Sequence, residues 1–249
     1  MSKSIYFASD FHLGLDKNGS SRAREDKIIR WLDSIIDDTA HLYLLGDLFD
    51  YWFEYKTVVP KGYLRFLSKL AQFTSRDIPV HIFTGNHDMW MFDYLETEIG
   101  AHIYREAISI KLINHHFVLG HGDGLGPGDH GYKFIKRVFR SPINKWLFAR
   151  IHPNLGIAIM KYYSQKSRDS QKANPPFLGP DKEWLIQYSE AEIKSNPKID
   201  YLIFGHRHLP LDYTLSNGKS RYINCGDWIE HNTYVKYDGH EVRLKTYDE

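Results

Sequence analysis

The chain has 249 residues, of which 42% are hydrophobic and 25% charged, with a formal net charge of +1. These values fit a soluble globular protein of one large domain, or a domain with an insertion, and by themselves indicate no nucleic-acid partner. One cysteine, Cys225, excludes an intrachain disulfide, and no apolar run approaches the roughly 20 residues that span a bilayer. The first residues lack a signal-peptide pattern, so we expect a cytoplasmic protein.

Short apolar runs in chain order predict the secondary structure. Five runs bounded by turn residues predict buried strands, at Ile5–Ala8, Leu42–Leu45, Val80–Phe83, His116–Leu119 and Tyr201–Phe204. Helical spacing predicts helices over 22–36, 62–73, 90–99 and 182–196. Further short strands are predicted over 108–113, 211–215, 222–224, 234–237 and 242–245. Alternating strands and helices followed by hairpins indicate an α/β fold, a mixed β-sandwich flanked by helices.

The turns that follow the five strands carry Asp, Asn and His. They read Ser9-Asp10-Phe11-His12, Gly46-Asp47-Leu48-Phe49-Asp50, Gly85-Asn86-His87-Asp88, Gly120-His121-Gly122-Asp123 and Gly205-His206-Arg207-His208. In open α/β folds, ligands bind beyond the carboxyl ends of the strands. We therefore expect one edge of one sheet to gather two Asp, one Asn and five His.

The chemistry of these side chains predicts a metal site. Asp10 and His12, like His206 and His208, are two residues apart and share one side of a turn. Carboxylate, amide and imidazole ligands without a thiolate suit Mn²⁺, with Fe²⁺ or Zn²⁺ as alternatives. Seven ligands are too many for one ion and suit two ions that share a carboxylate. Two divalent ions roughly 3.5–4 Å apart polarise a phosphate and hold a hydroxide for in-line attack.

The segment between the fourth and fifth strands breaks the pattern. From His130 to Lys172 it has ten basic residues and one acidic residue, Asp169, which gives a net charge of +9 and leaves −8 for the rest of the chain. Aromatic and aliphatic residues lie between the charges at helical spacings, broken near Pro142 and Pro153. A basic amphipathic insert is typical of a surface that binds anionic lipid, phosphate or nucleic acid. The alternative is a solvated face over an ordinary helical core.

The five motifs, in this order and at these spacings, resemble the signature of calcineurin-like metallophosphoesterases from Ser9 to Asp227. The resemblance implies a two-layer mixed β-sandwich flanked by helices, as one domain over 1–249. It implies that one metal is held by Asp10, His12, Asp47 and His208. It implies that the second is held by Asp47, Asn86, His121 and His206. His87 would face the substrate beside Asn86, with Asp88 orienting its ring.

A narrower resemblance is carried by Gly46 to Trp52, by His121-Gly122-Asp123, by the helical insert and by Cys225-Gly226-Asp227-Trp228. These segments are similar to the UDP-2,3-diacylglucosamine pyrophosphohydrolase family, which removes UMP from an acylated nucleotide sugar during lipid A synthesis. The resemblance implies a helical lid over about 130–175, a lipid-nucleotide substrate and peripheral contact with the anionic inner membrane on its cytoplasmic face. The candidate substrate contacts are Asp129, Tyr132, Lys166, Arg168 and Lys172. Asp129 and Tyr132 could instead cap and pack the first lid helix.

Two departures from that family leave alternatives open. His87 stands where the family has Arg, and Arg207 stands where it usually has Thr. Expulsion of a phosphate benefits from a fixed cation, whereas expulsion of an alkoxide benefits from a proton donor such as His. A phosphodiesterase or phosphatase acting on a soluble nucleotide is therefore the alternative, and a scaffold without catalysis is a third. An apolar tunnel open beside the metals would favour the lipid, and a closed lid would favour the soluble substrate.

The other polar residues are interpreted as supporting ones. Asp50, Asp88 and Asp123 lie beside ligands in the motifs and are expected to orient them. The nine histidines outside the motifs, among them His41 and His102, are expected to be structural.

Overall fold

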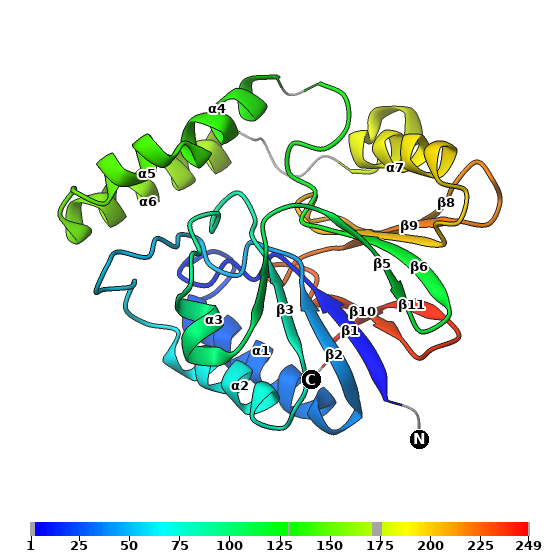
Figure 1. Ribbon diagram of the computed structural model, residues 1–249, viewed down its shortest axis with the longest axis horizontal. Coiled ribbons are helices and arrows are strands. Elements are labelled where there is room, and N and C mark those ends of the chain that lie inside the picture. Colours follow the sequence, from blue (N-terminus) through cyan, green and yellow to red (C-terminus); the bar gives the residue numbers. More distant parts are fainter. Residues whose placement is uncertain (1–2, 129, 171–175, 249) are drawn as a thin grey trace.

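The computed structural model describes residues 3–128, 130–170 and 176–248, with side chains left undescribed at 130–131 and 166–170. Two β-sheets face each other as a sandwich, and helices cover the outer faces (Figure 1). This is the mixed β-sandwich flanked by helices that the sequence predicted. Among the described residues, no helix is both long and apolar enough to cross a bilayer.

The first sheet has six strands in the order β11-β10-β1-β2-β3-β4. Its parallel strands are β1 (Ser4–Ala8), β2 (Thr39–Leu44), β3 (Val80–Phe83) and β4 (His102–Tyr104). The antiparallel strands at its other side are β10 (Thr233–Tyr237) and β11 (Val242–Thr246). The carboxyl ends of β1, β2 and β3 therefore lie at one edge.

The second sheet has five strands in the order β5-β6-β7-β9-β8. Its parallel core consists of β6 (His115–Leu119), β7 (Tyr201–Phe204) and β9 (Arg221–Cys225). Antiparallel strands lie at both edges, β5 (Ile108–Leu112) and β8 (Pro210–Thr214). The edge strand β4 was not predicted, because three residues at a sheet edge give too short a pattern.

Three layers of apolar side chains hold the sandwich together. Between the sheets, Phe7 stacks on Tyr43 and on Phe117, with ring centroids 5.2 and 6.0 Å apart. Helices α1 (Ser21–Ile35), α2 (Leu64–Thr74) and α3 (Tyr94–Ile99) cover the first sheet. Helix α7 (Trp184–Ser195) covers the second sheet.

Helix α1 illustrates how the sequence sets these elements. Its buried residues Ile28, Trp31, Leu32 and Ile35 recur at helical spacing on one face. The Ser20 hydroxyl accepts a hydrogen bond from the backbone N–H of Ala23 at 3.1 Å and so caps the first turn.

The expected helix over 90–99 begins only at Tyr94. The Glu54 carboxylate accepts the backbone N–H groups of Phe92, Asp93 and Tyr94 at 2.6, 2.9 and 3.2 Å. This carboxylate occupies the positive end of the helix, while Trp90 pairs with Phe53 in an isolated bridge. The side chain that starts the helix thus lies about 40 residues earlier in the chain, outside any local pattern.

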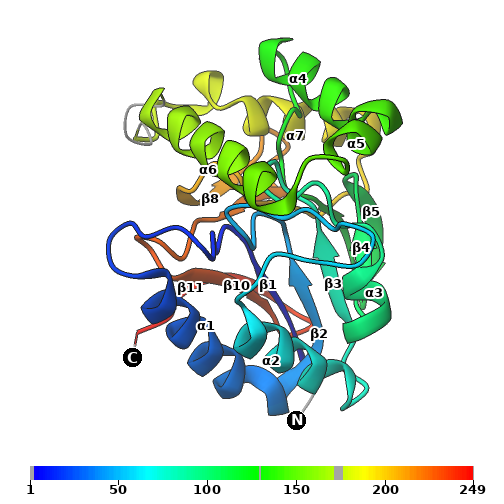
Figure 2. The same ribbon diagram turned by 90° about the vertical axis from the view of Figure 1, so that its left-hand side faces the viewer.

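The helical insertion forms α4 (His130–Arg140), α5 (Pro142–Phe148) and α6 (Pro153–Ser170). Figures 1 and 2 both show these helices as a separate group above the loops that follow the strands. Phe139, Phe148 and Ile157 pack against the buried pair Phe53 and Trp90, which anchors the insertion to the loops after β2 and β3.

Candidate metal centre

The predicted ligands converge, but from two sheets rather than one. The loops after β1, β2 and β3 extend from the first sheet, and those after β6 and β7 extend from the second. Our expectation of a single sheet was wrong, because a short strand buried on both faces carries no pattern that identifies its neighbours. The parallel strands of both sheets present their carboxyl ends at the same end of the sandwich.

Five of the predicted ligands lie in left-handed backbone. They are Asp10, His12, Asp47, His206 and His208, with φ of 56°, 44°, 52°, 67° and 57°. For a residue other than glycine, the left-handed conformation costs about 1–2 kcal/mol. Such strain persists only where the surroundings impose it, and it concentrates at functional sites.

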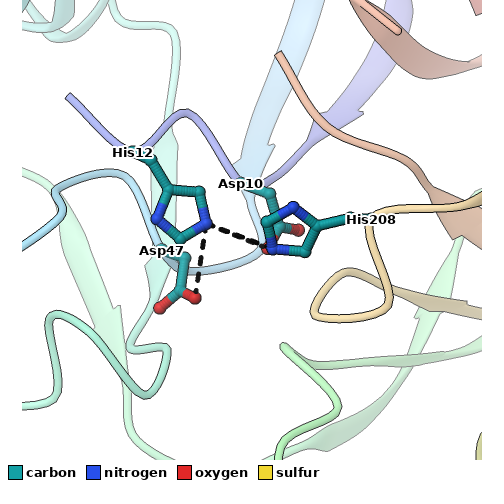
Figure 3. A group of neighbouring side chains, drawn as sticks. All are labelled: Asp10, His12, Asp47 and His208. Atoms are coloured by element: carbon teal, nitrogen blue, oxygen red, sulfur yellow. Dashed lines mark hydrogen bonds and ion pairs between the residues drawn. The ribbon is translucent and has the colours of Figure 1, made fainter. Parts of the chain in front are cut away.

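Asp10, His12, Asp47 and His208 form the first ligand group (Figure 3). The Nε2 atom of His12 lies 3.2 Å from Nε2 of His208 and 3.7 Å from Oδ2 of Asp47. The Nε2 atom of His208 lies 3.1 Å from Oδ1 of Asp10. Asp10, His12 and Asp47 are almost fully buried, so the carboxylates and imidazoles meet away from bulk water.

Asp47, His121 and His206 form the second group. The Nε2 atom of His121 lies 3.3 Å from Oδ2 of Asp47 and 3.1 Å from Oδ1 of Asn86. Asp47 belongs to both groups, as a bridging carboxylate must. Both groups are made of residues from the two ligand sets that the resemblance implied, and Asn86 of the second set lies beside His121.

Neighbouring acceptors orient two of the predicted ligand histidines. The Nδ1 atom of His121 lies 2.8 Å from the Leu45 carbonyl oxygen, which can only accept, so Nδ1 carries the proton. The Nδ1 atom of His208 lies 3.2 Å from Oδ2 of Asp227. In both rings Nε2 is the atom directed at the carboxylates, the arrangement of a metal-binding imidazole. Sequence reasoning quoted Asp227 in a motif but did not assign it this role.

The charges of the site fit a bound cation. Burial favours a higher pKa for Asp10, yet His208 and His12 hold this pKa well below its usual range. Burial disfavours protonated His121 and His208, yet Asp47 and Asp10 respectively raise their pKa values to about 10. In the metal-free protein, imidazolium groups thus supply the positive charge that the carboxylates require. Oδ1 of Asp10 is also fully buried, and Nε2 of His208 lies 3.1 Å from it.

His87 lies against Asp50 and helix α6 rather than against Asp88. Its Nδ1 atom is 3.2 Å from the Asp50 carbonyl oxygen and 3.0 Å from the Ser164 hydroxyl. The Asp88 carboxylate instead accepts the backbone N–H groups of Gly85 and Leu48, both at 2.7 Å. The expectation that Asp88 orients the His87 ring was wrong, since its carboxylate faces backbone and joins the loops after β2 and β3.

The predicted substrate contacts are only partly described. Tyr132 on α4 donates to Oδ2 of Asp123 at 2.6 Å, and its ring centroid lies 6.3 Å from that of His206. Tyr132 therefore connects the insertion to the loop that carries His121. Asp129 and Lys172 lie outside the described residues, as do the side chains of Lys166 and Arg168.

A buried arginine fixes the loop after β1. Nε and Nη2 of Arg24 donate to the carbonyl oxygens of Phe11 and His12, both at 2.8 Å. Nη2 also contacts the carbonyl of Leu15, and only 7% of the residue is exposed. The fork of Arg24 thus fixes the backbone around His12 from outside the ligand shell. No sequence motif pointed to it.

An open cleft runs between α6 and the loops beside the ligands. One part has a volume of about 240 Å³ and is lined by Asp50, Tyr51, Tyr63, Ile157 and Lys161, among others. A second part of about 380 Å³ shares Gly14, Asp50 and Lys161. Among the described residues the cleft wall is both apolar and cationic, and it includes Asp50, which contacts His12 and His87.

Comparison with known proteins agrees with this geometry. The family model for calcineurin-like phosphoesterases matches residues 3–210. A Porphyromonas gingivalis protein named UDP-2,3-diacylglucosamine hydrolase is 36% identical, and the match covers 100% of this chain and 99% of that protein. A protein of the same name from Shewanella halifaxensis is 27% identical over 96% of this chain and 95% of its own. The match to a solved archaeal phosphodiesterase covers 98% of this chain and 99% of that one, at 13% identity and a TM-score of 0.49. The family match, together with the two ligand groups that share Asp47, shows that the chain belongs to the calcineurin-like phosphoesterase family.

Proposed function

We propose that this phosphoesterase hydrolyses the pyrophosphate bond of UDP-2,3-diacylglucosamine, releasing UMP and 2,3-diacylglucosamine 1-phosphate. The observation that carries the proposal is the full-length, 36% identical relative named for that substrate, in a chain whose ligand groups share Asp47. The reaction belongs to lipid A synthesis, and the site chemistry is that of a two-metal hydrolase.

The proposed metals are two divalent ions, with Mn²⁺ preferred and Fe²⁺ or Zn²⁺ as alternatives. One would be held by Asp10, His12, Asp47 and His208, and the other by Asp47, Asn86, His121 and His206. Oxygen and imidazole donors support this choice, and the buried Cys225 is not part of either group. When bound, two such ions polarise the phosphate and supply the nucleophile.

His87 is the proposed catalytic side chain beside the metals. Because the Asp50 carbonyl can only accept, the contact at 3.2 Å makes Nδ1 of His87 a donor. We propose that Nε2 acts on the substrate, either as a proton donor or, when protonated, as a cation beside the departing phosphate. Asn86 and Asp88 act around it, Asn86 as a ligand and Asp88 by holding Gly85 and Leu48.

The helical insertion is proposed to act as the lid that selects the lipid. Large apolar side chains on α4, α5 and α6 are exposed, among them Phe134, Ile143, Trp146 and Tyr162 at 65, 69, 55 and 61%. Together with the excess of basic residues, they suit acyl chains and an anionic membrane surface. We therefore propose peripheral contact with the cytoplasmic face of the inner membrane, with Tyr132, Asp129, Lys166, Arg168 and Lys172 as candidate substrate contacts.

A phosphodiesterase acting on a soluble nucleotide is the second candidate. It is favoured by His87 in place of the Arg of the lipid-hydrolysing family, and by Lys61 and Lys161 in the wall of the open cleft. The exposed apolar surface of the insertion would then have another use. The two candidates share the metal groups and differ in what the cleft accepts.

Turnover of three substrates with Mn²⁺ tests the proposal: UDP-2,3-diacylglucosamine, UDP-glucose and bis(p-nitrophenyl) phosphate. We expect UMP from the lipid substrate alone. Asp47→Ala should abolish this release. Removal of one electrostatic contact typically lowers kcat ~10²–10³-fold, and the loss here should be larger because Asp47 belongs to both ligand groups. Asp212→Ala, which removes an exposed carboxylate on β8, is the matched control and should retain activity.

Two outcomes would contradict parts of the proposal. Hydrolysis of only the small diester would retain the metals and reject the lipid. Near-native turnover by Asp47→Ala would reject the shared-carboxylate mechanism.

A further inference from the structure

The loop between the last two predicted ligands contains an ion pair that touches neither predicted metal group. Arg207 separates His206 from His208, and its guanidinium binds the Glu183 carboxylate through two contacts. Nε lies 3.1 Å from Oε2, and Nη2 lies 3.0 Å from Oε1. The two residues are only 5 and 3% exposed, so this is a buried, bidentate pair.

The backbone on both sides of Arg207 is strained. His206 and His208 have φ of 67° and 57°, so two left-handed, non-glycine residues flank one ordinary residue. Other contacts fix the start of the loop, including the N–H of Gly205 to the His121 carbonyl oxygen at 2.9 Å and Asn224 Nδ2 to the Gly205 carbonyl oxygen at 2.6 Å. At the middle of the loop, the side chain of Arg207 is a brace placed between the two strained residues.

Glu183 is an unusual partner for this brace. It occupies the position that caps α7, where a carboxylate commonly accepts a backbone N–H of the first turn. Its side chain makes no such capping bond and is directed to Arg207 instead. Glu183 also lies where the chain returns from the helical insertion to the second sheet. The pair therefore ties the ligand loop to the base of the insertion.

We propose that the Arg207–Glu183 pair is a positioning element for both metals, because it holds His206 and His208 in the conformation that ligation needs. His208 belongs to one ligand group and His206 to the other, so one brace serves two sites. The inference rests on the proposed two-metal function. Neither side chain is a ligand, and removal of groups that orient ligands typically lowers metal affinity about 10–100-fold.

The experiment separates positioning from simple structural support. Removal of one partner alone leaves a buried charge and destabilises a protein, whereas replacement of both by apolar residues is often neutral. We therefore compare Arg207→Met/Glu183→Leu with the wild-type protein. Thermal unfolding gives stability, and calorimetric Mn²⁺ titration of the metal-free protein gives stoichiometry and affinity. We expect near-native unfolding with a 10–100-fold loss of Mn²⁺ affinity.

Two further variants keep the test decisive. Arg207→Lys retains the charge and loses the fork, so it should fold normally and bind Mn²⁺ several-fold more weakly even if the double variant fails to fold. Arg221→Met/Asp212→Leu removes a similar fork between β8 and β9 and should leave Mn²⁺ affinity unchanged. Native affinity in a folded double variant or in Arg207→Lys would overturn the proposal. Because the readout is metal binding, rejection of the lipid substrate would leave this result interpretable.

Discussion

Two groups of histidines in this chain have different neighbours. The site histidines, at the carboxyl ends of strands, are His12, His87, His121, His206 and His208. The strand histidines, within β2, β3 and β4, are His41, His81 and His102. Carboxylates contact most of the first group, whereas aromatic rings and other imidazoles surround the second.

The strand histidines form a stack across neighbouring strands. The ring of His81 lies 4.3 Å from that of Tyr43, 5.4 Å from His41 and 5.2 Å from His102. Its Nε2 and Nδ1 atoms contact His41 Nδ1 and the Tyr104 hydroxyl, both at 3.2 Å. Burial and the neighbouring His41 lower the pKa of His81 to about 4, so the ring stays neutral.

The contrast shows that carboxylates, not histidines, distinguish the candidate metal centre. Asp47 raises the pKa of His121 to about 10 despite burial, and the two proposed metals would share the same carboxylate. Three histidines without a carboxylate pack as aromatic residues. Contact with a carboxylate thus raises the pKa of His121 and His208, whereas burial and the neighbouring His121 lower the pKa of His206 to about 4.

Replacement of His87 tests the chemistry of the site histidines. On the pyrophosphate substrate we expect His87→Arg to retain turnover within about tenfold, since a fixed cation suits a departing phosphate. A loss on the order of 10²–10⁴-fold would instead identify His87 as a proton donor. Steady-state kcat and kcat/KM for UDP-2,3-diacylglucosamine measure the difference. The control is His102→Arg, an exposed strand histidine that should leave turnover unchanged.

Metal removal should separate the two groups by stability. At 100 times its Kd, a metal stabilises the folded state by about 2.7 kcal/mol, which corresponds to a rise of roughly 5–10 °C in Tm for a chain of this size. We expect Mn²⁺ to raise the Tm of the wild-type protein and of His102→Ala, relative to chelator. His121→Ala or His206→Ala should lose most of that rise. A full Mn²⁺ shift in both site variants would place the metal elsewhere.

The sequence predicted the strands and the convergence of their ends because both depend on local patterns. Short apolar runs before small turns are visible within ten residues, and parallel strands bring such turns together. The pairing of Asp47 with His121 came instead from the resemblance to metallophosphoesterases. The division between two sheets does not follow from local patterns, because every core strand is buried on both faces.

The residues that orient the ligands could not be predicted in the same way. Asp50 and Asp88 both flank predicted ligands in the motifs. The geometry of the turns places Asp50 against His87 and directs the Asp88 carboxylate to the backbone. Arg24 and Arg207 act through partners on other elements. A sequence pattern records spacing along one element, so contacts between elements require the folded structure.

The smallest expected effect concerns the pH dependence of stability. His81 has a pKa of about 4 in the folded protein and about 6.5 when unfolded. Between these values the unfolded state binds more protons, so the folded state loses stability as pH falls below 6.5. Discounted for solvent screening, we expect about 1 kcal/mol at pH 5, or roughly 2–4 °C in Tm.

His81→Phe should remove this contribution because phenylalanine can stack on Tyr43 but cannot be protonated. Its Tm at pH 7.5 should be lower than that of the wild-type protein, since two hydrogen bonds are lost, and it should fall less on acidification to pH 5. His240→Phe, which alters an exposed histidine, should retain the wild-type slope. Measurements in chelator give all three proteins the same metal-free site, so the difference in slope reports His81 alone. Parallel curves of Tm against pH for the wild-type protein and His81→Phe would mean that the His81 ring accepts a proton as readily in the folded as in the unfolded protein. The contrast between site and strand histidines would then not extend to their protonation.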